Sequence, residues 1–272
     1  MIIILSKIDI ENQIGKGIFI VPFKRNNIKE NSINFTLSKL AWTIKPKDSG
    51  DGFNRAEPAC NNGVITLKPK STTVVYTEEV VALNNRYGGT FHAKVGIVSK
   101  GVVFCSTMIG PSYCGHLMIS LQNSTNKEIK MKVGDTFISL VLHKLDHAIS
   151  KIHTNSNTGG HTEKLNRLGI HTSDDEDRYL GEDWKKNIST ISEKLKQETD
   201  YNSLKEELKK KHMIYNGVLL VVALIVLVLL YISFRYFLIH EKLSSILLSL
   251  GITFLLGTIE HVEGKLKGLF KI

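Results

Sequence analysis

The side chains that could do chemistry in this sequence gather between Gly89 and Leu142, in motifs that contain glycine. The motifs are Gly-Thr-Phe-His-Ala-Lys-Val-Gly from Gly89, Ile-Gly-Pro-Ser-Tyr-Cys-Gly-His-Leu from Ile109 and Lys-Val-Gly-Asp from Lys132. Glycine permits backbone conformations that other residues avoid, so these motifs predict turns that display polar side chains. Short apolar strands separate the turns. We therefore expect the functional site in this stretch.

Two histidines of the stretch, His92 and His116, could serve as a base pair or as metal ligands. Neither histidine has a carboxylate beside it in the sequence, and a metal site needs more ligands than two. Lone histidines on strands are more often core or surface residues. The sequence therefore predicts no metal site.

The three cysteines cannot all pair with one another, and none belongs to a Cys-x-x-Cys motif. They are Cys60, Cys105 and Cys114. This usage favours a reduced, cytoplasmic compartment. We interpret Cys105 and Cys114 as buried strand or turn residues.

Short strands bounded by Gly, Pro and Asn must position the motifs. Residues 32–37 (Ser-Ile-Asn-Phe-Thr-Leu) alternate with a period of two, as a half-buried strand does. A short helix is expected after Ser6, a candidate N-cap. Further strands are expected at 2–5, 18–22, 64–67, 74–76, 91–98, 102–105, 117–121 and 137–142. This pattern predicts a mostly β domain, a barrel or sandwich, over residues 1–145.

Beyond residue 145 the strand pattern ends. Residues 146–183 are expected to be a linker, with the acidic run Asp174–Asp177 as a solvated spacer. Residues 184–212 become helical in character, and their two apolar sets are out of register with each other. They predict a helical stalk, either a short broken coiled coil or a stalk packed on the barrel.

The segment 213–239 is predicted to cross a membrane. Its central run, Gly217–Phe234, carries no charge and shows no polar face, and it is long enough to span the hydrocarbon core. A second apolar run, diluted by serine and glycine, predicts another transmembrane helix at 243–260. Small residues let two such helices pack closely, so a hairpin is expected. An interfacial or re-entrant helix is the alternative for the second run.

Basic residues flank the predicted hairpin unevenly. Lysines precede the first span and follow the second, at Lys205, Lys209, Lys210, Lys211, Lys265, Lys267 and Lys271, whereas the connection offers Arg235 and Lys242. The positive-inside rule then places both the β domain and the basic tail, 261–272, in the cytoplasm. The formal net charge of +9 comes without an arginine cluster or interleaved aromatics. We therefore expect a lipid bilayer and nucleotide phosphates as partners, and no sequence-specific nucleic acid.

The order of motifs in residues 1–145 resembles the dCTP deaminase and dUTPase superfamily, and within it the dCTP deaminase branch. The motifs that carry the resemblance are Asp9-Ile10, Ile20-Val21-Pro22, Ser32-Ile33-Asn34-Phe35, Leu67-Lys68-Pro69 and Thr77-Glu78-Glu79. The resemblance implies a dUTPase-like β-barrel or jelly roll. It also implies a homotrimer with nucleotide pockets between subunits.

The resemblance assigns roles to residues of the stretch, and this sequence departs from the family at several of them. The family's phosphate-binding Ser-Ser-x-x-Arg-x-Gly appears as Thr90, Phe91 and Lys94 before Gly96. Carboxylates of the family fall on Gly110 and Ser120, and neither residue can move a proton as a carboxylate does. The residues implied for nucleotide binding are Thr90, Phe91, His92, Lys94, Gly110, Ser112, Tyr113, Ser120 and Ser139. We predict no catalytic residue and no cofactor.

The leading hypothesis is therefore a cytoplasmic nucleotide-sensing pseudoenzyme domain that controls a membrane hairpin. Such an arrangement resembles bacterial antiviral effectors, which answer a nucleotide signal, cyclic or otherwise, by permeabilising the inner membrane. An active membrane-tethered dCTP deaminase or dUTP pyrophosphatase is one alternative, and it needs another carboxylate such as Glu78 or Glu79. A structural oligomerisation platform is the other.

Overall fold

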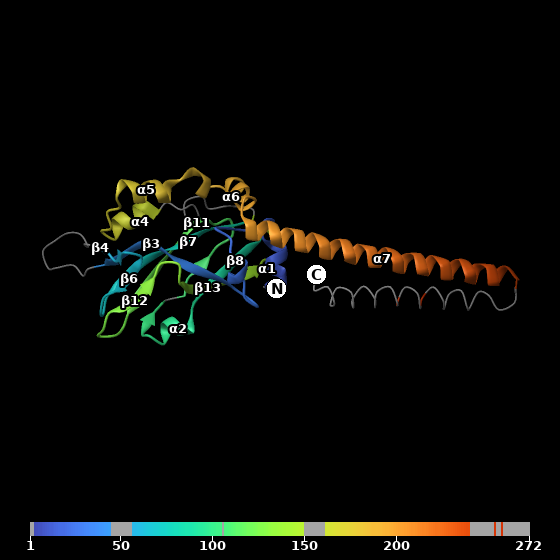
Figure 1. Ribbon diagram of the computed structural model, residues 1–272, viewed down its shortest axis with the longest axis horizontal. Coiled ribbons are helices and arrows are strands. Elements are labelled where there is room, and N and C mark those ends of the chain that lie inside the picture. Colours follow the sequence, from blue (N-terminus) through green and yellow to red (C-terminus); the bar gives the residue numbers. More distant parts are fainter. Residues whose placement is uncertain are drawn as a thin grey trace. The chain divides into compact units, whose positions relative to one another are not determined.

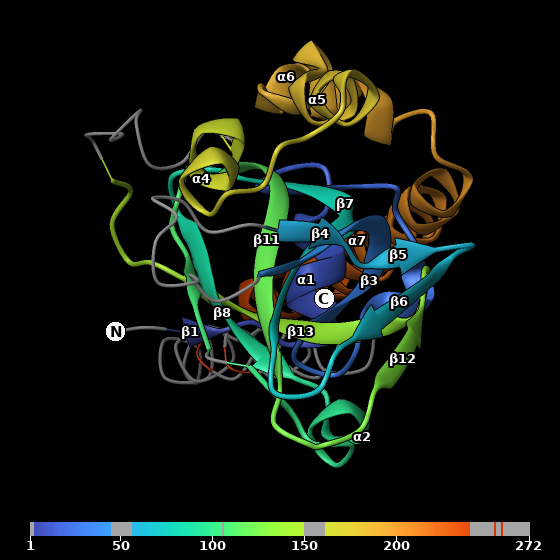
Figure 2. The ribbon, with the colours of Figure 1, turned by 90° about the vertical axis from the view of Figure 1, so that its left-hand side faces the viewer.

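The computed structural model describes residues 3–44, 56–104, 106–149 and 161–239, with residues 253 and 257. The chain divides into two units, Met1–Asn202 and Ser203–Ile272. The first unit carries the sheets and is drawn in Figures 1 and 2. Cys105 lies outside the described residues.

Antiparallel strands form the body of the first unit. They are β1 (Ile3–Ile4), β2 (Ile18–Val21), β3 (Ile33–Ile44), β4 (Ala56–Pro58), β5 (Cys60–Asn61), β6 (Val64–Leu67), β7 (Thr72–Leu83), β8 (Tyr87–Ala93), β9 (Val102–Val103), β10 (Met108–Ile109), β11 (Cys114–Asn123), β12 (Ile129–Lys132) and β13 (Thr136–Lys144). The larger sheet has the order β10-β8-β13-β3-β7-β11-β9, and β1, β2 and β4 pair with β13, β7 and β3. The smaller sheet has the order β12-β6-β5. The predicted mostly β fold is confirmed.

The apolar residues of the alternating strands lie in the core of the large sheet, but the strand predicted to be half-buried at 32–37 is buried on both faces, because Asn34 and Thr36 are buried as well. Ile138, Leu140 and Leu142 of β13 are fully buried. The rings of Phe35 on β3 and Phe91 on β8 meet edge to face, with centroids 6.4 Å apart. Intervening residues of the same strands therefore project from the opposite face.

A helix predicted from an N-cap is confirmed at α1 (Lys7–Gln13). Ser6 accepts a hydrogen bond from the Asp9 backbone, and the Asp9 carboxylate accepts one from the Ser6 backbone. These reciprocal bonds form a capping box that satisfies amides at the start of the helix. A single helical turn, η1 (Arg25–Asn27), follows β2.

The strand predicted at 91–98 is wrong beyond Ala93. Val95–Val98 forms a short helix, α2, although valine and isoleucine favour strands. Backbone hydrogen bonds run from Val98 N–H to Lys94 O and from Ser99 N–H to Val95 O, at 3.2 and 2.8 Å. Because β8 has already left its partner strands, local helical bonds satisfy this segment instead.

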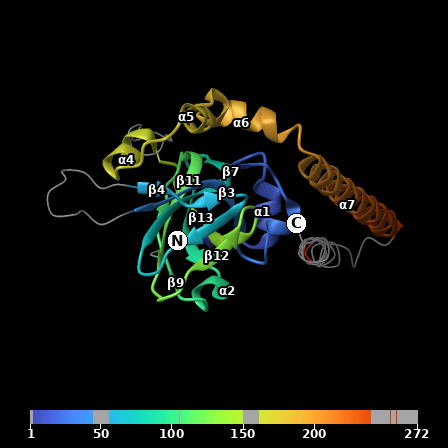
Figure 3. The same cartoon turned by 60° about the vertical axis from the view of Figure 1, so that its left-hand side comes forward.

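The structure also differs from the predicted linker at 146–183, because its second part is helical and packed. The helices are α4 (His161–Arg167), α5 (Asp174–Gly181), η2 (Asp183–Lys185) and α6 (Ile188–Leu195). We call residues 161–198 the strap. In Figures 1 and 3 its helices follow one another along one side of the sheets, next to β7 and β11.

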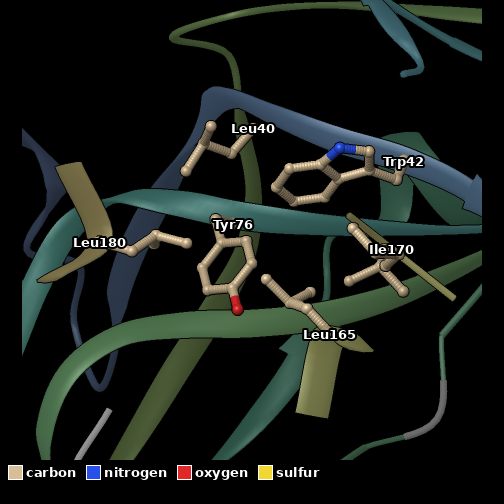
Figure 4. Close-up of a cluster of buried hydrophobic side chains, with 7 residues drawn as sticks. Leu40, Trp42, Tyr76, Leu165, Ile170 and Leu180 are labelled. Carbon is tan, nitrogen blue, oxygen red and sulfur yellow. The ribbon is translucent and has the colours of Figure 1, made fainter. Parts of the chain in front are cut away.

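Three apolar side chains hold the first part of the strap. Leu165, Ile170 and Leu180 are buried against Trp42 and Tyr76 of the large sheet (Figure 4). The Trp42 and Tyr76 rings meet edge to face, with centroids 6.1 Å apart. A buried aliphatic side chain contributes about 1.5–3 kcal/mol, so a few such residues can fix an otherwise polar segment.

The acidic run belongs to α5 rather than to an unstructured spacer. Ser173 caps this helix, and Glu176 returns a hydrogen bond to the Ser173 backbone at 2.8 Å. Carboxylates stabilise the first turn of a helix because they face its unpaired amides. Asp174 and Asp175 are exposed, whereas Glu176 and Asp177 are partly buried.

The segment predicted as a stalk is divided between two helices. Ile191 and Leu195 of α6 are fully buried, and α6 packs against β2 and β7. Helix α7 (Thr199–Ile239) then begins within the first unit. Of the alternatives left open, the observed one for α6 is packing on the barrel.

One helix among the described residues is long and apolar enough to cross a membrane. It comprises Thr199–Ile232 of α7, its most apolar stretch of 18 residues has a mean hydropathy of 2.8, and large apolar side chains such as Leu220 and Leu224 are exposed on it. The predicted second helix at 243–260 and the tail at 261–272 lie outside the described residues, apart from Thr253 and Gly257. A two-span topology remains a prediction.

Candidate functional site

A row of polar side chains crosses β3, β13 and β8 on the face opposite the core. The hydroxyl of Thr90 lies 3.1 Å from His92 Nε2 and 3.3 Å from His143 Nε2. Ser139 is the cross-strand partner of His92, and its hydroxyl donates to Asn34 Oδ1 at 2.7 Å. We call these five residues the polar row. It brings together Thr90, His92 and Ser139, which were implied from the sequence for nucleotide binding.

Phe91 does not belong to this site. It alternates with Thr90 and His92 along β8, so its side chain points to the opposite face and is buried in the core. The expectation that Phe91 binds a ligand is therefore wrong. Its contribution is to packing.

Lys94 lies at the end of β8 and lines a pocket of about 280 Å³. Its ammonium group donates to Thr136 Oγ1 at 2.5 Å. Two further lysines, Lys100 and Lys130, line the same pocket together with Asp135. With three lysines and one aspartate among its lining residues, the pocket has an excess of positive charge, which suits an anion.

The second motif forms a loop between β10 and β11. Ile109 pairs with Gly89, and a Cβ at the neighbouring Gly88 would lie 3.1 Å from the Ile109 carbonyl. The glycine therefore permits the loop to approach β8 closely. Gly110 follows this contact, and Ser112 adopts a positive φ of 63°. At about 3.3 Å per residue, Gly110 and Lys94 are separated by most of the length of β8.

Tyr113 ends this loop and faces β11. Its hydroxyl donates a hydrogen bond to the backbone carbonyl of His116. Burial raises the pKa of the Tyr113 phenol above its ordinary value. The phenol is therefore a neutral hydrogen-bond donor in this position.

Ser120 lies apart from the other implied residues. It is an exposed residue of β11 and pairs with Val74 of β7. Neither Ser120 nor Gly110 lines the lysine-rich pocket or the second described pocket, which lies at the strap and has about 400 Å³. Within one subunit, the structure does not bring these two positions to Lys94.

The carboxylate of Glu79 occupies a buried position on β7. It accepts hydrogen bonds from the Thr36 backbone amide at 2.9 Å and the Thr36 hydroxyl at 2.8 Å. Burial raises the pKa of this carboxyl, although the bonds from Thr36 and the charge of Lys24 act in the opposite direction. Glu79 lines neither described pocket of the single subunit.

Two other residues of the motifs, His116 and Cys114, lie in surroundings typical of structural residues. His116 is buried, with Nδ1 3.0 Å from the Thr77 carbonyl. Burial raises the pKa of the Cys114 thiol to about 11. Among the described residues, no group of three or more His, Cys, Asp or Glu side chains could hold a metal ion.

Comparison with known proteins identifies the family of the β domain. The dCTP deaminase-like family model matches residues 4–145, which is more than half of the chain. The chain belongs to the dCTP deaminase-like family. The resemblance inferred from the motifs is thereby confirmed at the level of the family.

The dCTP deaminase-like domain is similar to archaeal proteins over about half of this chain. The dCTP deaminase of Thermococcus kodakarensis is 22% identical over 138 residues, which cover 49% of this chain and 81% of the relative. The dCTP deaminase of Pyrococcus horikoshii is 21% identical over 134 residues, which cover 49% and 80%.

Solved structures similar to the dCTP deaminase-like domain include a 2′-deoxycytidine 5′-triphosphate deaminase from Agrobacterium tumefaciens. That match has a TM-score of 0.44 at 15% identity and covers 59% of this chain, but only 51% of the other. The EIAV dUTPase matches with a TM-score of 0.29 at 18% identity, over 43% of this chain and 94% of the other.

Sequence reasoning missed several residues of the dCTP deaminase-like domain. Asn34 and His143 reach the polar row through strand register, which no local pattern reveals. Lys100 and Lys130 reach the pocket from the turn after α2 and from β12, and both look like ordinary surface lysines in the sequence. The period of two along β8 was sufficient to place Thr90 and His92 on the same face of the strand.

Proposed function

We propose that this protein binds a nucleotide through its dCTP deaminase-like domain without converting it, and that binding controls a membrane helix. The observation that carries the proposal is the lysine-rich pocket, in which Lys94 is joined by Lys100 and Lys130. Ammonium groups are compact charges that suit phosphate oxygens. A pyrimidine nucleotide is the first ligand to test, because the similar archaeal proteins are named dCTP deaminases.

The absence of conversion rests on two positions. Gly110 and Ser120 stand where the family resemblance implies carboxylates, and neither residue can accept a proton and release it again at neutral pH as a carboxylate does. Glu79 is buried and engaged with Thr36. A domain that keeps cationic groups and lacks these carboxylates is suited to binding rather than to catalysis.

A homotrimer would complete the site. Lys94 and the loop from Gly110 to Tyr113 lie at different ends of β8 in one subunit, so one ligand would touch both groups most readily if they came from neighbouring copies. The family resemblance implies a trimer with pockets of this kind. We propose that the ligand bridges subunits in this way.

The membrane part of the proposal follows the sequence. Segments 213–239 and 243–260 would form a hairpin in a bacterial inner membrane, with the domain and the tail in the cytoplasm. A ligand can act on the hairpin only if it binds one arrangement of the subunits better than another. We propose an effector of antiviral defence that permeabilises the membrane when its nucleotide is bound.

The binding claim is tested by calorimetric titration of the full chain in detergent with dCTP, dUTP and cyclic nucleotides. We expect saturable binding of at least one nucleotide, which Lys94→Glu abolishes while the β domain stays folded. The matched control is Lys127→Glu, a charge reversal at an exposed lysine outside the pocket, and it should leave affinity within about twofold.

Other results would replace the proposal. Affinity that Lys94→Glu leaves unchanged would show that the pocket is misplaced. Release of a uridine nucleotide or pyrophosphate would identify an active membrane-tethered enzyme. An intact trimer that binds none of the nucleotides would identify a structural platform.

A further inference from the structure

The middle of the strap is held by a buried charge. Lys185 is 3% exposed, and its ammonium group lies 3.4 Å from the centroid of the Tyr179 ring and 3.2 Å from Glu182 Oε2. The same group donates to the Tyr179 carbonyl. Burying an ammonium ion is costly unless such partners compensate, so these contacts specify how the strap is seated.

The strap meets the sheet at His116. The imidazole ring of His116 stacks on the Tyr179 ring, with centroids 5.2 Å apart and an angle of 29° between the planes. His116 is 3% exposed, and its Nδ1 is fixed at the Thr77 carbonyl. We call His116, Tyr179 and Lys185 the latch.

The loop of the candidate site touches the latch directly. The Tyr113 hydroxyl donates to the His116 carbonyl, and the Cys114 thiol donates to the Lys185 carbonyl at 3.3 Å. Tyr113 and Cys114 are therefore bonded to the latch, and the preceding residues, Gly110 to Ser112, form the loop beside β8. A shift of this loop would therefore displace a hydrogen-bond partner of His116, on the sheet side of the latch. It would also displace a partner of Lys185, on the strap side.

The far end of the strap leads into α7 through further anchors. Ile191 and Leu195 are fully buried in α6. At the start of α7, Asp200 accepts a hydrogen bond from the Arg25 backbone at 3.0 Å. The Tyr201 ring packs edge to face on Phe23, with centroids 6.5 Å apart. These anchors follow the latch along the chain as far as the first turn of α7.

We propose that the latch couples the loop Gly110–Tyr113 to the strap, so that the arrangement of this loop sets how firmly the strap and the first turn of α7 are docked. The regulatory half of the inference rests on the proposed nucleotide binding, because a bound ligand would be what biases the loop. The coupling itself is a property of the chain and can be measured without a ligand.

The test is hydrogen exchange of the full chain in detergent, read over residues 174–201. Tyr179→Ala removes the ring shared by His116 and Lys185, and it should speed exchange in the strap by roughly tenfold or more. Tyr113→Phe removes only the hydrogen bond to His116, on the sheet side, and it should speed strap exchange by roughly threefold or more. Strands β3 and β13 serve as the internal reference and should keep their protection.

The matched control is Lys186→Ala, the exposed neighbour of Lys185. It should change strap exchange by less than about twofold. If Tyr179→Ala loosens the strap but Tyr113→Phe behaves like this control, the latch is only an anchor and the coupling is refuted. If neither variant loosens the strap, the latch itself is refuted.

A nucleotide arm separates this inference from the proposed function. Addition of dCTP or dUTP should change strap exchange in the wild type, and this response should be lost in Tyr179→Ala. If a nucleotide binds by calorimetry but strap exchange does not respond, the coupling fails and the proposed function stands. If no nucleotide binds but Tyr113→Phe loosens the strap, the coupling stands and the proposed function fails.

Discussion

Glu79 carries a carboxylate in a position where water scarcely reaches it. Only 1% of the residue is exposed, and its carboxylate oxygens accept from Thr36. Burial disfavours the charged form, so the pKa of the Glu79 carboxyl rises above its ordinary value. The residue is thus a source of pH dependence in stability rather than a group at the lysine-rich pocket.

The sign of that dependence follows from linkage. The folded protein holds the Glu79 proton more tightly than the unfolded chain, so the contribution to stability is fully present below the unfolded pKa and is lost as pH rises through the folded one. The free energy of unfolding of the wild type minus that of Glu79→Gln should therefore fall as pH rises from 4.5. Urea titrations of both proteins at a series of pH values upward from 4.5 measure this difference in the free energy of unfolding. A difference that stays flat or grows with pH would contradict the account.

At the residue scale, the sequence was informative wherever alternation along a single strand decides the face on which a side chain lies. The alternation of Thr90, Phe91 and His92 sorts two polar side chains from one core side chain, and applying it strictly would have excluded Phe91. Asn34 and His143 could not be found in this way, because their places in the polar row depend on how β3 and β13 pair with β8.

At the element scale, the strap shows how little apolar sequence is needed to dock a segment. Between residues 161 and 181, the buried Leu165, Ile170 and Leu180 are spread among polar residues, and the partly buried Leu168 and Tyr179 pack against the same cluster. Local periodicity does not reveal these anchors, because their spacing follows neither a single helical period nor a strand period. The pattern therefore predicted a linker where the chain is packed.

The strap core gives a direct prediction. Leu165→Ala should lower the free energy of unfolding by about 2–5 kcal/mol if the strap and sheet unfold together, since it leaves a cavity against Trp42 and Tyr76. Trp fluorescence during urea denaturation measures this loss. Lys164→Ala, an exposed position of the same helix, should change stability by less than about 0.5 kcal/mol. Equal effects of the two variants would show that Leu165 is not an anchor.

The start of α7 gives a second prediction at this scale. Gly15 has a φ of 79°, and a Cβ there would overlap the Tyr201 ring and hydroxyl. Gly63 has a similar φ of 73° but faces open space. Both alanine variants should carry backbone strain of about 1 kcal/mol, whereas only Gly15→Ala should also displace Tyr201.

Hydrogen exchange at residues 199–202 distinguishes the two glycine variants. Exchange should accelerate in Gly15→Ala and stay close to the wild type in Gly63→Ala. Equal exchange in both variants would show that Tyr201 is not seated against Gly15 in solution.

At the scale of the whole molecule, composition and hydrophobic periodicity were the most informative features of the sequence. The alternating half was correctly predicted to be mostly β, and the apolar run of α7 provides the one described helix that could cross a membrane. The order of short motifs was sufficient to indicate the dCTP deaminase-like family. The convergence of the site residues could not be predicted, because it depends on strand register and, in our proposal, on neighbouring subunits.

The central claim is that a nucleotide held at Lys94 sets the state of the membrane segment, and dye release from liposomes tests it most directly. The full chain would be reconstituted into vesicles of bacterial lipid composition, and release followed with and without dCTP, dUTP and cyclic nucleotides. We predict release that requires one of these nucleotides and is lost in Lys94→Glu but kept in Lys127→Glu. Vesicles that stay sealed under every condition, or that leak equally with Lys94→Glu, would contradict it.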